Sequence, residues 1–333
     1  MKLTGKQFFQ VVLSLALAGW IFWFLYKDIS WDNLTAMFLE SSFFWLTISL
    51  IISVIGFWLR AWRWALLIDA DTQHQTKTIR AFVALMVGYL ANLAVPRAGE
   101  IARCGVLVKT EEKQLGGLIG TVVLERTIDL LFMLGTILLA FIIERQLFVS
   151  LFSELVSLEA LLEKISGALP LVIGGLGIAV LFLFLVFKKY QHHSAFKKIR
   201  HFLRDMVRGI ISLRNVKNQW GFWGSSTLIW VSYYLTMLTV VWAIPATASL
   251  SLSSVLLVMV MGSIGMVAPV QGGIGTFHAL VAYILIAFGL EEADGKIFAA
   301  IIHGVQMLLI IVLGLFSLGY FLKIIAQKAS KTS

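Results

Sequence analysis

The 333-residue sequence has little charge, cysteine or proline. Only 14% of its residues are charged, whereas soluble domains carry about 25%, so a chain of ordinary soluble domains is excluded. A single cysteine, Cys104, cannot form an internal disulfide and does not indicate a compartment. The sequence also lacks a P-loop, a nucleophile elbow and a spacing of metal ligands. We therefore expect no cofactor and no metal.

Long apolar runs, in contrast, recur from end to end, and the mean hydropathy is +0.90. The runs are continuous rather than alternating, which predicts membrane-spanning helices. They lie at about 8–26, 43–67, 79–95, 115–143, 168–187, 221–245, 252–268, 274–290 and 296–322, with a shorter piece at 99–108. We expect one all-α integral membrane domain over 1–333. Its first run ends in WFLYKDIS without a cleavage site, so it is expected to remain as a helix.

The distribution of basic residues predicts how these helices cross the membrane. The 188–217 connection carries nine lysines and arginines against one acid, which places it in the cytoplasm. The 144–167 and 291–296 connections are mostly acidic and are expected outside, so both termini are cytoplasmic. Apolar residues recur at helical spacing within 188–217, which predicts a basic amphipathic helix on anionic lipid. This helix would act as a topology anchor or gather lipid headgroups.

Two regions, 79–108 and 252–290, admit two paths through the membrane. Each either crosses twice with short helices or enters the bilayer and returns to the same side. We favour re-entrant hairpins, because 99–108 is too short to span about 30 Å. The expected fold is a polytopic helical bundle of about six full spans plus two broken hairpins, or about eight spans. One hairpin would enter from each face, and no sequence repeat is evident.

Eight charged residues lie within these apolar stretches, where each costs roughly 2.5–3.5 kcal/mol. They are Arg60, Arg63, Arg97, Glu100, Arg103, Glu125, Arg126 and Asp129. In VPRAGEIAR, a spacing of three places Arg97, Glu100 and Arg103 on one helical face with a net positive charge. Two guanidiniums with one spare charge suit a phosphate held bidentately. The alternative is a salt bridge that pins a kinked hairpin.

The second cluster, in LERTIDLL, has the opposite sign. Glu125 and Asp129 are four residues apart on one helical face, with Arg126 turned away. The simplest inference is that the two clusters meet, since three arginines then nearly balance three acids. The result is either an internal ion network or a cavity in which a ligand phosphate displaces a carboxylate.

Two further motifs contain polar residues in apolar surroundings. In FWLRAWRWALL, tryptophans surround Arg60 and Arg63, which predicts an interfacial belt in which arginines snorkel or contact headgroups. In APVQGGIGTFHALVAY, the proline and Gly272, Gly273 and Gly275 are expected to break a helix. The N–H groups at its restart would favour an anion. His278 is either a proton carrier or a hydrogen-bonded packing residue.

In this order, RAWRWALL, PRAGEIAR, ERTIDL and PVQGGIGTFH resemble the lysylphosphatidylglycerol synthase transmembrane (flippase-like) family over nearly the whole chain. The resemblance implies a membrane domain that moves a lipid, sometimes an aminoacylated phospholipid, between leaflets. The matching positions are Arg97, Gly99, Glu100, Arg103, Glu125, Arg126, Asp129, Gly272, Gly273 and Gly275. Gln271 replaces a second proline of many relatives, and His278 stands near an acid of theirs. No segment resembles the soluble aminoacyl-transferase domain of some members, so lysyl-transferase activity is not expected.

The function expected is a translocator, not an enzyme, that moves a phosphate-bearing lipid or lipid-linked headgroup across the cytoplasmic membrane. Its partners would be the membrane and an anionic phospholipid or lipid-linked intermediate, besides a homo-oligomer or a separate lipid-modifying enzyme. The net charge of +9 is interpreted as contact with anionic headgroups and not with nucleic acid. The alternative is a membrane-embedded transferase using a lipid-linked donor, for glycosyl or aminoacyl transfer, with Asp28, Asp32 or Glu40 as base or metal ligand. A third alternative is a scaffold held together by its ion pairs.

Overall fold

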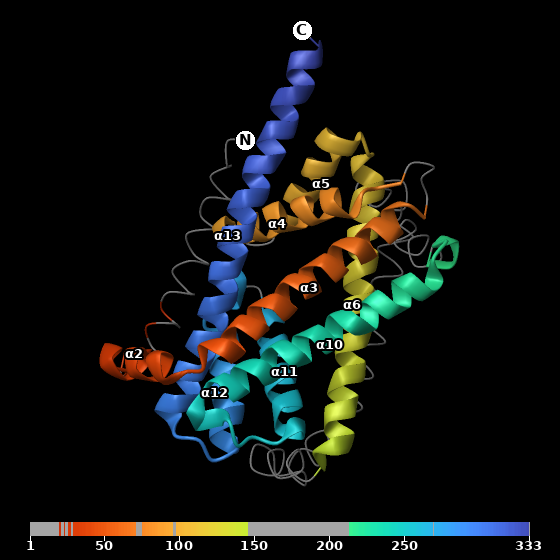
Figure 1. Cartoon of the computed structure of the whole chain (residues 1–333). Coiled ribbons are helices and arrows are strands. Elements are labelled where there is room, and N and C mark those ends of the chain that lie inside the picture. The colour runs from red at the N-terminus through yellow and green to blue at the C-terminus, as the bar shows by residue number, and fades with distance from the viewer. Residues whose placement is uncertain are drawn as a thin grey trace, which may run out of the picture.

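The computed structural model describes residues 29–70, 75–95, 98–145, 213–268 and 270–332, with Trp20, Trp23, Tyr26 and Lys27 before them. None of these residues is in a strand, which confirms the all-α prediction for the part described. The main helices are α2 (Trp31–Glu40), α3 (Phe43–Ile68), α4 (Thr78–Ala94), α5 (Gly99–Glu111), α6 (Leu115–Ile143), α10 (Gln219–Ala243), α11 (Leu252–Val267), α12 (Thr276–Ala287) and α13 (Glu292–Thr332), as Figure 1 shows. Most of the 8–26 run, the 168–187 run and the 188–212 part of the basic loop lie outside the described residues.

Four of the described helices, α3, α6, α10 and α13, are long and apolar enough to cross a membrane. α13 is longer than the expected 296–322 run, because the helix continues without a break into the basic tail. The segment between the expected runs at 8–26 and 43–67 contains the short helix α2, which the apolar runs did not reveal. The Ser30 hydroxyl caps α2 by accepting a hydrogen bond from the Asn33 N–H at 3.1 Å.

The centre of the bundle is an antiparallel pair formed by α3 and α10. At one end, the Ser42 N–H that precedes α3 donates to the Ala243 carbonyl at the end of α10, at 2.7 Å. At the other end, Leu67 and Phe222 share one core cluster. Midway, Gly56 brings the two backbones close together, because a Cβ there would lie 2.7 Å from the Ser232 Oγ.

Two helical hairpins extend from opposite ends of this pair. Hairpin 1 (α4 and α5) follows the end of α3, and hairpin 2 (α11 and α12) follows the end of α10. Since α3 and α10 are antiparallel, the two hairpins lie at opposite ends, toward the top and the bottom of Figure 1. Their helices have 12 to 17 residues, or roughly 18–26 Å at 1.5 Å per residue, which is less than the apolar thickness of a bilayer.

The described helices form two units with the same order: a long helix, a hairpin and a second long helix. The second long helix of each unit packs on the hairpin of the other, α13 on α4 and α6 on α11. Both hairpin turns carry the spacing P-x-x-G-x-I, at 96–101 and 269–274. The repetition is therefore one of helix order, and in the sequence it is visible only in the turns. Many apolar side chains serve equally well on a membrane helix, so the helices of the two units need not have similar sequences. The turns need particular residues, and only there do the two units share proline, glycine and isoleucine at the same spacing.

Close packing within hairpin 1 depends on glycine. A Cβ at Gly99 would lie 2.2 Å from the Gly88 carbonyl oxygen, which is a backbone atom and cannot move aside. The Gly99 N–H donates to the Asn92 Oδ1 at 2.7 Å, which ties the start of α5 to α4. The turn between the two helices is therefore held by a backbone contact and by one side-chain hydrogen bond.

We predict that Gly99→Ala destabilises the protein, whereas Gly105→Ala on the same helix does not. Overpacking at Gly99 should lower the free energy of unfolding by about 1–3 kcal/mol. A Cβ at Gly105 would meet nothing within 4 Å, so alanine there should be neutral or slightly stabilising. Unfolding of both variants in detergent, followed by circular dichroism, measures the difference. Equal stability of the two variants would contradict the close approach of α4 and α5.

Candidate functional site

A network of ion pairs is buried between α3, α5 and α6. Arg60 and Arg63 are three residues apart and face α6 from the same side of α3. The Arg60 Nη2 lies 2.9 Å from the Glu125 Oε1 and 3.1 Å from the Asp129 Oδ2. The Arg63 Nη2 lies 2.6 Å from the Asp129 Oδ1. The side chains of Arg63 and Glu125 are completely buried, so these charges depend on one another rather than on water.

Arg103 joins hairpin 1 to the same carboxylate. Its Nη1 lies 2.8 Å from the Glu125 Oε2, and its Nη2 lies 2.9 Å from the Glu100 Oε2. The guanidinium also covers the Trp64 ring at 4.5 Å from the centroid, a cation–π contact. Glu125 therefore pairs with arginines from two different helices. This contact confirms the prediction that the VPRAGEIAR and LERTIDLL clusters meet.

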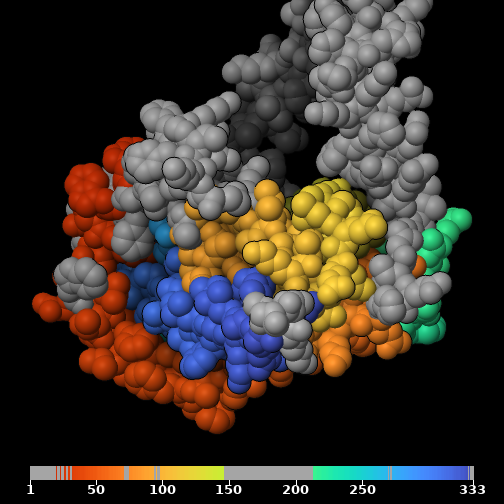
Figure 2. Space-filling view, turned by 90° about the horizontal axis from the view of Figure 1, so that it is seen from above, coloured from red at the N-terminus to blue at the C-terminus, as the bar shows by residue number. Residues whose placement is uncertain are grey.

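The network opens at one end. Glu100 pairs with Arg126, whose Nε donates to the Glu100 Oε1 at 2.9 Å. The exposed fraction of the side chain is 28% for Glu100 and 48% for Arg126, against 0% for Glu125. A charged ligand would therefore reach the network at the Glu100–Arg126 end first. α5, α6 and α13 lie beside one another on the face of the molecule that Figure 2 shows from above.

The position expected for Arg60 and Arg63, an interfacial belt, is corrected by the structure. Arg60 is 8% and Arg63 0% exposed, and both are paired with carboxylates. Trp64 is also fully buried, whereas Trp58 is 44% exposed. The physical reason is that α6 presents two carboxylates to this face of α3. Pairing with a buried carboxylate satisfies a guanidinium that would otherwise have to reach the headgroups.

The network has more positive charge and more donors than its carboxylates use. Four arginines share three carboxylates, which leaves one formal positive charge. The Nε atoms of Arg60, Arg63 and Arg103 and the Nη1 of Arg63 are buried and have no hydrogen-bond partner in the part of the chain described. A buried donor without an acceptor costs about 1–3 kcal/mol. These atoms are therefore the natural partners of an anion that enters the network.

Arg97 and the two turn prolines lie outside the described residues. Arg97 belongs to the turn of hairpin 1 by sequence, directly before Ala98. It adds a formal positive charge to the same motif as Glu100 and Arg103. Its role in phosphate contact remains a prediction.

The glycines of hairpin 2 form the expected break but are not joined to the arginine network by any ion pair or hydrogen bond among the described residues. Gly272, Gly273 and Gly275 have φ values of 58°, 74° and 90°, which side chains rarely adopt. The Gly275 N–H donates to the His278 Nδ1 at 3.2 Å, so the helix restart is partly satisfied by its own chain. The expectation that it is open to an anion is corrected in this respect.

The hairpin turns nevertheless approach each other through apolar contacts. A Cβ at Gly272 would lie 3.6 Å from the Leu93 Cδ2, near the end of α4. The η3 turn (Gln271–Gly273) as a whole lies against α4. The breaks of the two units therefore lie close together inside the bundle.

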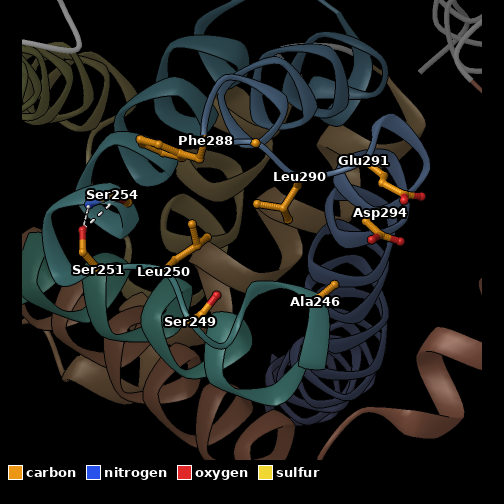
Figure 3. Close-up of a pocket in the computed structure, with 10 residues that line it drawn as sticks. Ala246, Ser249, Leu250, Ser251, Ser254, Phe288, Leu290, Glu291 and Asp294 are labelled. Carbon is orange, nitrogen blue, oxygen red and sulfur yellow. Dashed lines mark hydrogen bonds between the residues drawn. The ribbon is translucent and has the colours of Figure 1, made fainter.

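A pocket of about 480 Å³ lies between the α10–α11 and α12–α13 connections. It is lined by Ala246, Ser249, Leu250, Ser251, Ser254, Phe288, Gly289, Leu290, Glu291 and Asp294, as Figure 3 shows. Its only charged side chains are Glu291 and Asp294. Two carboxylates would repel a phosphate, so the arginine network is the better candidate for an anion site.

The sequence did not indicate two polar contacts that complete the site. The Tyr233 hydroxyl on α10 accepts from the Arg60 Nη1 at 2.6 Å. The Trp64 Nε1 donates to the Thr121 Oγ1 on α6 at 3.0 Å. A tyrosine within an apolar run was the only available signal for the first contact, and tyrosines are common at membrane interfaces. No group of metal ligands occurs among the described residues.

A family model described as lysylphosphatidylglycerol synthase TM region matches residues 11–314. The match includes α3, α5 and α6, and therefore every residue of the ion network. No match was found among curated proteins or among solved structures.

We predict that Glu125→Gln strongly lowers the free energy of unfolding of the bundle relative to the wild type. The change leaves arginines buried without their carboxylate, which costs about 3–5 kcal/mol. Glu112→Gln is the matched control, because Glu112 is 85% exposed and pairs with Lys328 at the surface. Thermal unfolding in detergent compares the two variants. If both lose the same stability, the network does not hold α3, α5 and α6 together.

Proposed function

The chain belongs to the lysylphosphatidylglycerol synthase TM region family, a family of multi-pass membrane domains, and we propose that it is a lipid translocator. It moves the phosphate-bearing headgroup of a lipid or lipid-linked intermediate across the cytoplasmic membrane. The observation that carries this proposal is the buried arginine network with unused donors. The family match supports a membrane domain, and the chemistry of the network supports a phosphate.

Both termini lie in the cytoplasm under this proposal. Basic residues at the hairpin 1 end of the bundle support this orientation: Lys77, Arg80, Lys109, Lys113, Lys323 and Lys328. Acidic residues at the start of α13, including Glu292 and Asp294, support placing the other end outside. Hairpin 1 then enters from the cytoplasmic face and hairpin 2 from the outer face. Non-helical turns at membrane depth are tolerated here because other helices cover them.

A scaffold without a ligand explains the network less well. A purely structural ion cluster gains most when charges balance and every donor has an acceptor. Here one positive charge is in excess, and the Nε atoms of Arg60, Arg63 and Arg103 have no hydrogen-bond acceptor among the described residues. A phosphate monoester or diester supplies both the negative charge and the acceptor oxygens. Arginine suits it because the planar fork matches two phosphate oxygens.

The path of the headgroup follows from the exposure of the network. A phosphate first meets Arg126 at the open end and displaces Glu100 from it. It then pairs with Arg103, while the carboxylate of Glu125 continues to hold Arg60 and Arg63. The acyl chains stay in lipid throughout, so only the headgroup crosses the apolar layer. Because the two hairpins enter from opposite faces, each can close one side of the path.

We predict that Arg103→Lys reduces transport of a phospholipid at least about 10-fold while the protein stays folded. Lysine keeps the charge beside Glu125 but lacks the Nε donor and the fork. Arg80→Lys is the matched control: Arg80 pairs with Glu111 outside the network, at 3.3 Å, and its variant should transport normally. The assay follows a fluorescent phosphatidylglycerol in vesicles containing the purified protein. Mass spectrometry of co-purified lipids should show an anionic lipid enriched in wild type and lost in Arg103→Lys.

Two results would overturn the assignment. Wild-type transport by Arg103→Lys would mean that the network is only a scaffold. Loss of function in an Asp28→Asn, Asp32→Asn double variant, with Arg103→Lys active, would instead support the transferase. Asp32 lies in α2, and Asp28 lies outside the described residues.

A further inference from the structure

Two histidines are buried side by side where hairpin 2 meets α13. His278 on α12 is 5% exposed and His303 on α13 is 6% exposed. Their ring centroids are 4.7 Å apart, with 37° between the ring planes. His303 also lies within hydrogen-bonding range of the backbone of Gly272, in the turn of hairpin 2. The pair therefore connects the broken turn to a long helix.

The pair lies at the contact between α12 and α13, and the corresponding contact in the first unit, between α5 and α6, contains an ion pair. In the first unit, the helix after the turn meets the next long helix through Arg103 and Glu125. In the second unit, the contact between the corresponding helices includes His278 and His303. The positions are not equivalent along the helices, since Arg103 is seven residues after the proline of its turn and His278 is nine residues after the proline of its own. The contact in the first unit thus contains permanently charged side chains, whereas the contact in the second unit contains histidines, which can gain and lose a proton.

Among the described residues, no ion pair involves the His303 ring, whose ring contacts are with Phe277 and His278. α11 carries no titratable side chain. Tyr26 contacts His278 edge to face, with ring centroids 5.7 Å apart, and its hydroxyl donates to the Lys296 carbonyl at 2.8 Å. On α13, Lys296 pairs with Glu292 one turn away, at 2.6 Å. The His303 ring therefore lies against His278 and against Phe277, whose ring centroid is 5.0 Å away.

The hydrogen bonds identify the atom that can take a proton. The His278 Nδ1 accepts from the Gly275 N–H, so the neutral His278 ring carries its own proton on Nε2. The His303 Nδ1 is buried and has no hydrogen-bond partner in the described part of the chain. This nitrogen carries a lone pair to which no hydrogen-bond donor points. A proton bound there would give the His303 ring one positive charge. Since the rings lie 4.7 Å apart, the pair holds one added proton more readily than two.

We propose that the His278–His303 pair is a proton-binding site that couples headgroup movement to proton movement. This inference rests on the proposed function. An added proton on the His303 Nδ1 gives an imidazolium cation beside the turn of hairpin 2. The turn also packs on Leu93 of hairpin 1. The bound proton and an anion at the arginines would therefore both lie inside the same helical bundle. The cation and the phosphate attract, and by linkage each strengthens the binding of the other.

Proton and anion then cross together, and the proton leaves to water when the headgroup leaves. One proton carried with one headgroup of charge −1 makes the step electroneutral. A difference of one pH unit therefore drives up to about a 10-fold difference in probe concentration between the leaflets. A translocator without coupling makes the two leaflets equal.

The test uses the purified full chain in vesicles of phosphatidylcholine and phosphatidylglycerol with a trace of fluorescent phosphatidylglycerol. Dithionite quenching reports the fraction of probe in the outer leaflet, with and without one pH unit across the membrane. Wild type should accumulate the probe on the alkaline side. His303→Gln should lose this asymmetry, and His303→Glu, which restores a titratable group, should regain it. His74→Gln removes a histidine outside the pair and should behave as wild type.

The outcomes separate the two proposals. If wild type moves the probe but leaves it evenly distributed under the gradient, or if His303→Gln keeps the asymmetry, proton coupling is wrong and the translocator stands. If wild type does not move the probe, the proposed function fails. In that case, nitrogen-15 NMR of the histidines tests the proton site independently of transport. The spectra are recorded at about pH 6 with short-chain phosphatidylglycerol added. An imidazolium signal that His303→Gln lacks supports the site, and its absence in wild type overturns it.

Discussion

The carboxylate of Glu125 is the charge around which the first unit is arranged. It is completely buried, and arginines from α3 and α5 surround both of its oxygens. An isolated carboxylate in such a place would be strongly unfavourable, so the arginines and the carboxylate must be present together. The requirement fixes how α3, hairpin 1 and α6 lie relative to one another. It also explains why a short, broken helix such as α5 remains in a fixed position inside an apolar bundle.

The second unit repeats the arrangement without the permanent charges. Its hairpin is broken by glycines with positive φ, and its contact with the following long helix includes two histidines. The unit is consequently held by packing, as at Gly265, where a Cβ would lie 2.7 Å from the Phe277 Cα. The two units therefore share an order of helices but differ in the side chains that lie between those helices. The first contains arginines, which we propose bind an anion, and the second contains the histidine pair, which we propose binds a proton.

Much of the fold could be predicted from local patterns. The apolar runs at 43–67 and 115–143 correspond to α3 (Phe43–Ile68) and α6 (Leu115–Ile143), because length and hydropathy are properties of each segment alone. The meeting of the two charged clusters also followed, since buried charges of opposite net sign have few other partners. The positions of Arg60 and Arg63 did not follow. An arginine beside tryptophans has the same local sequence whether it snorkels to an interface or pairs with Asp129, 66 residues away from Arg63.

The sequence by itself determined an all-helical membrane chain, two broken hairpins and a set of charges that had to find partners in an apolar interior. Composition and spacing suffice for this, because the cost of a charge in hydrocarbon does not depend on the fold. Only the tertiary structure decided which charges meet, which donors stay unused and which histidines become neighbours. These facts depend on the crossing of helices that are distant in the chain, such as α12 and α13 at His278 and His303. A membrane helix can pack against many apolar neighbours at almost equal free energy, so the sequence of a single segment does not determine which helices become neighbours.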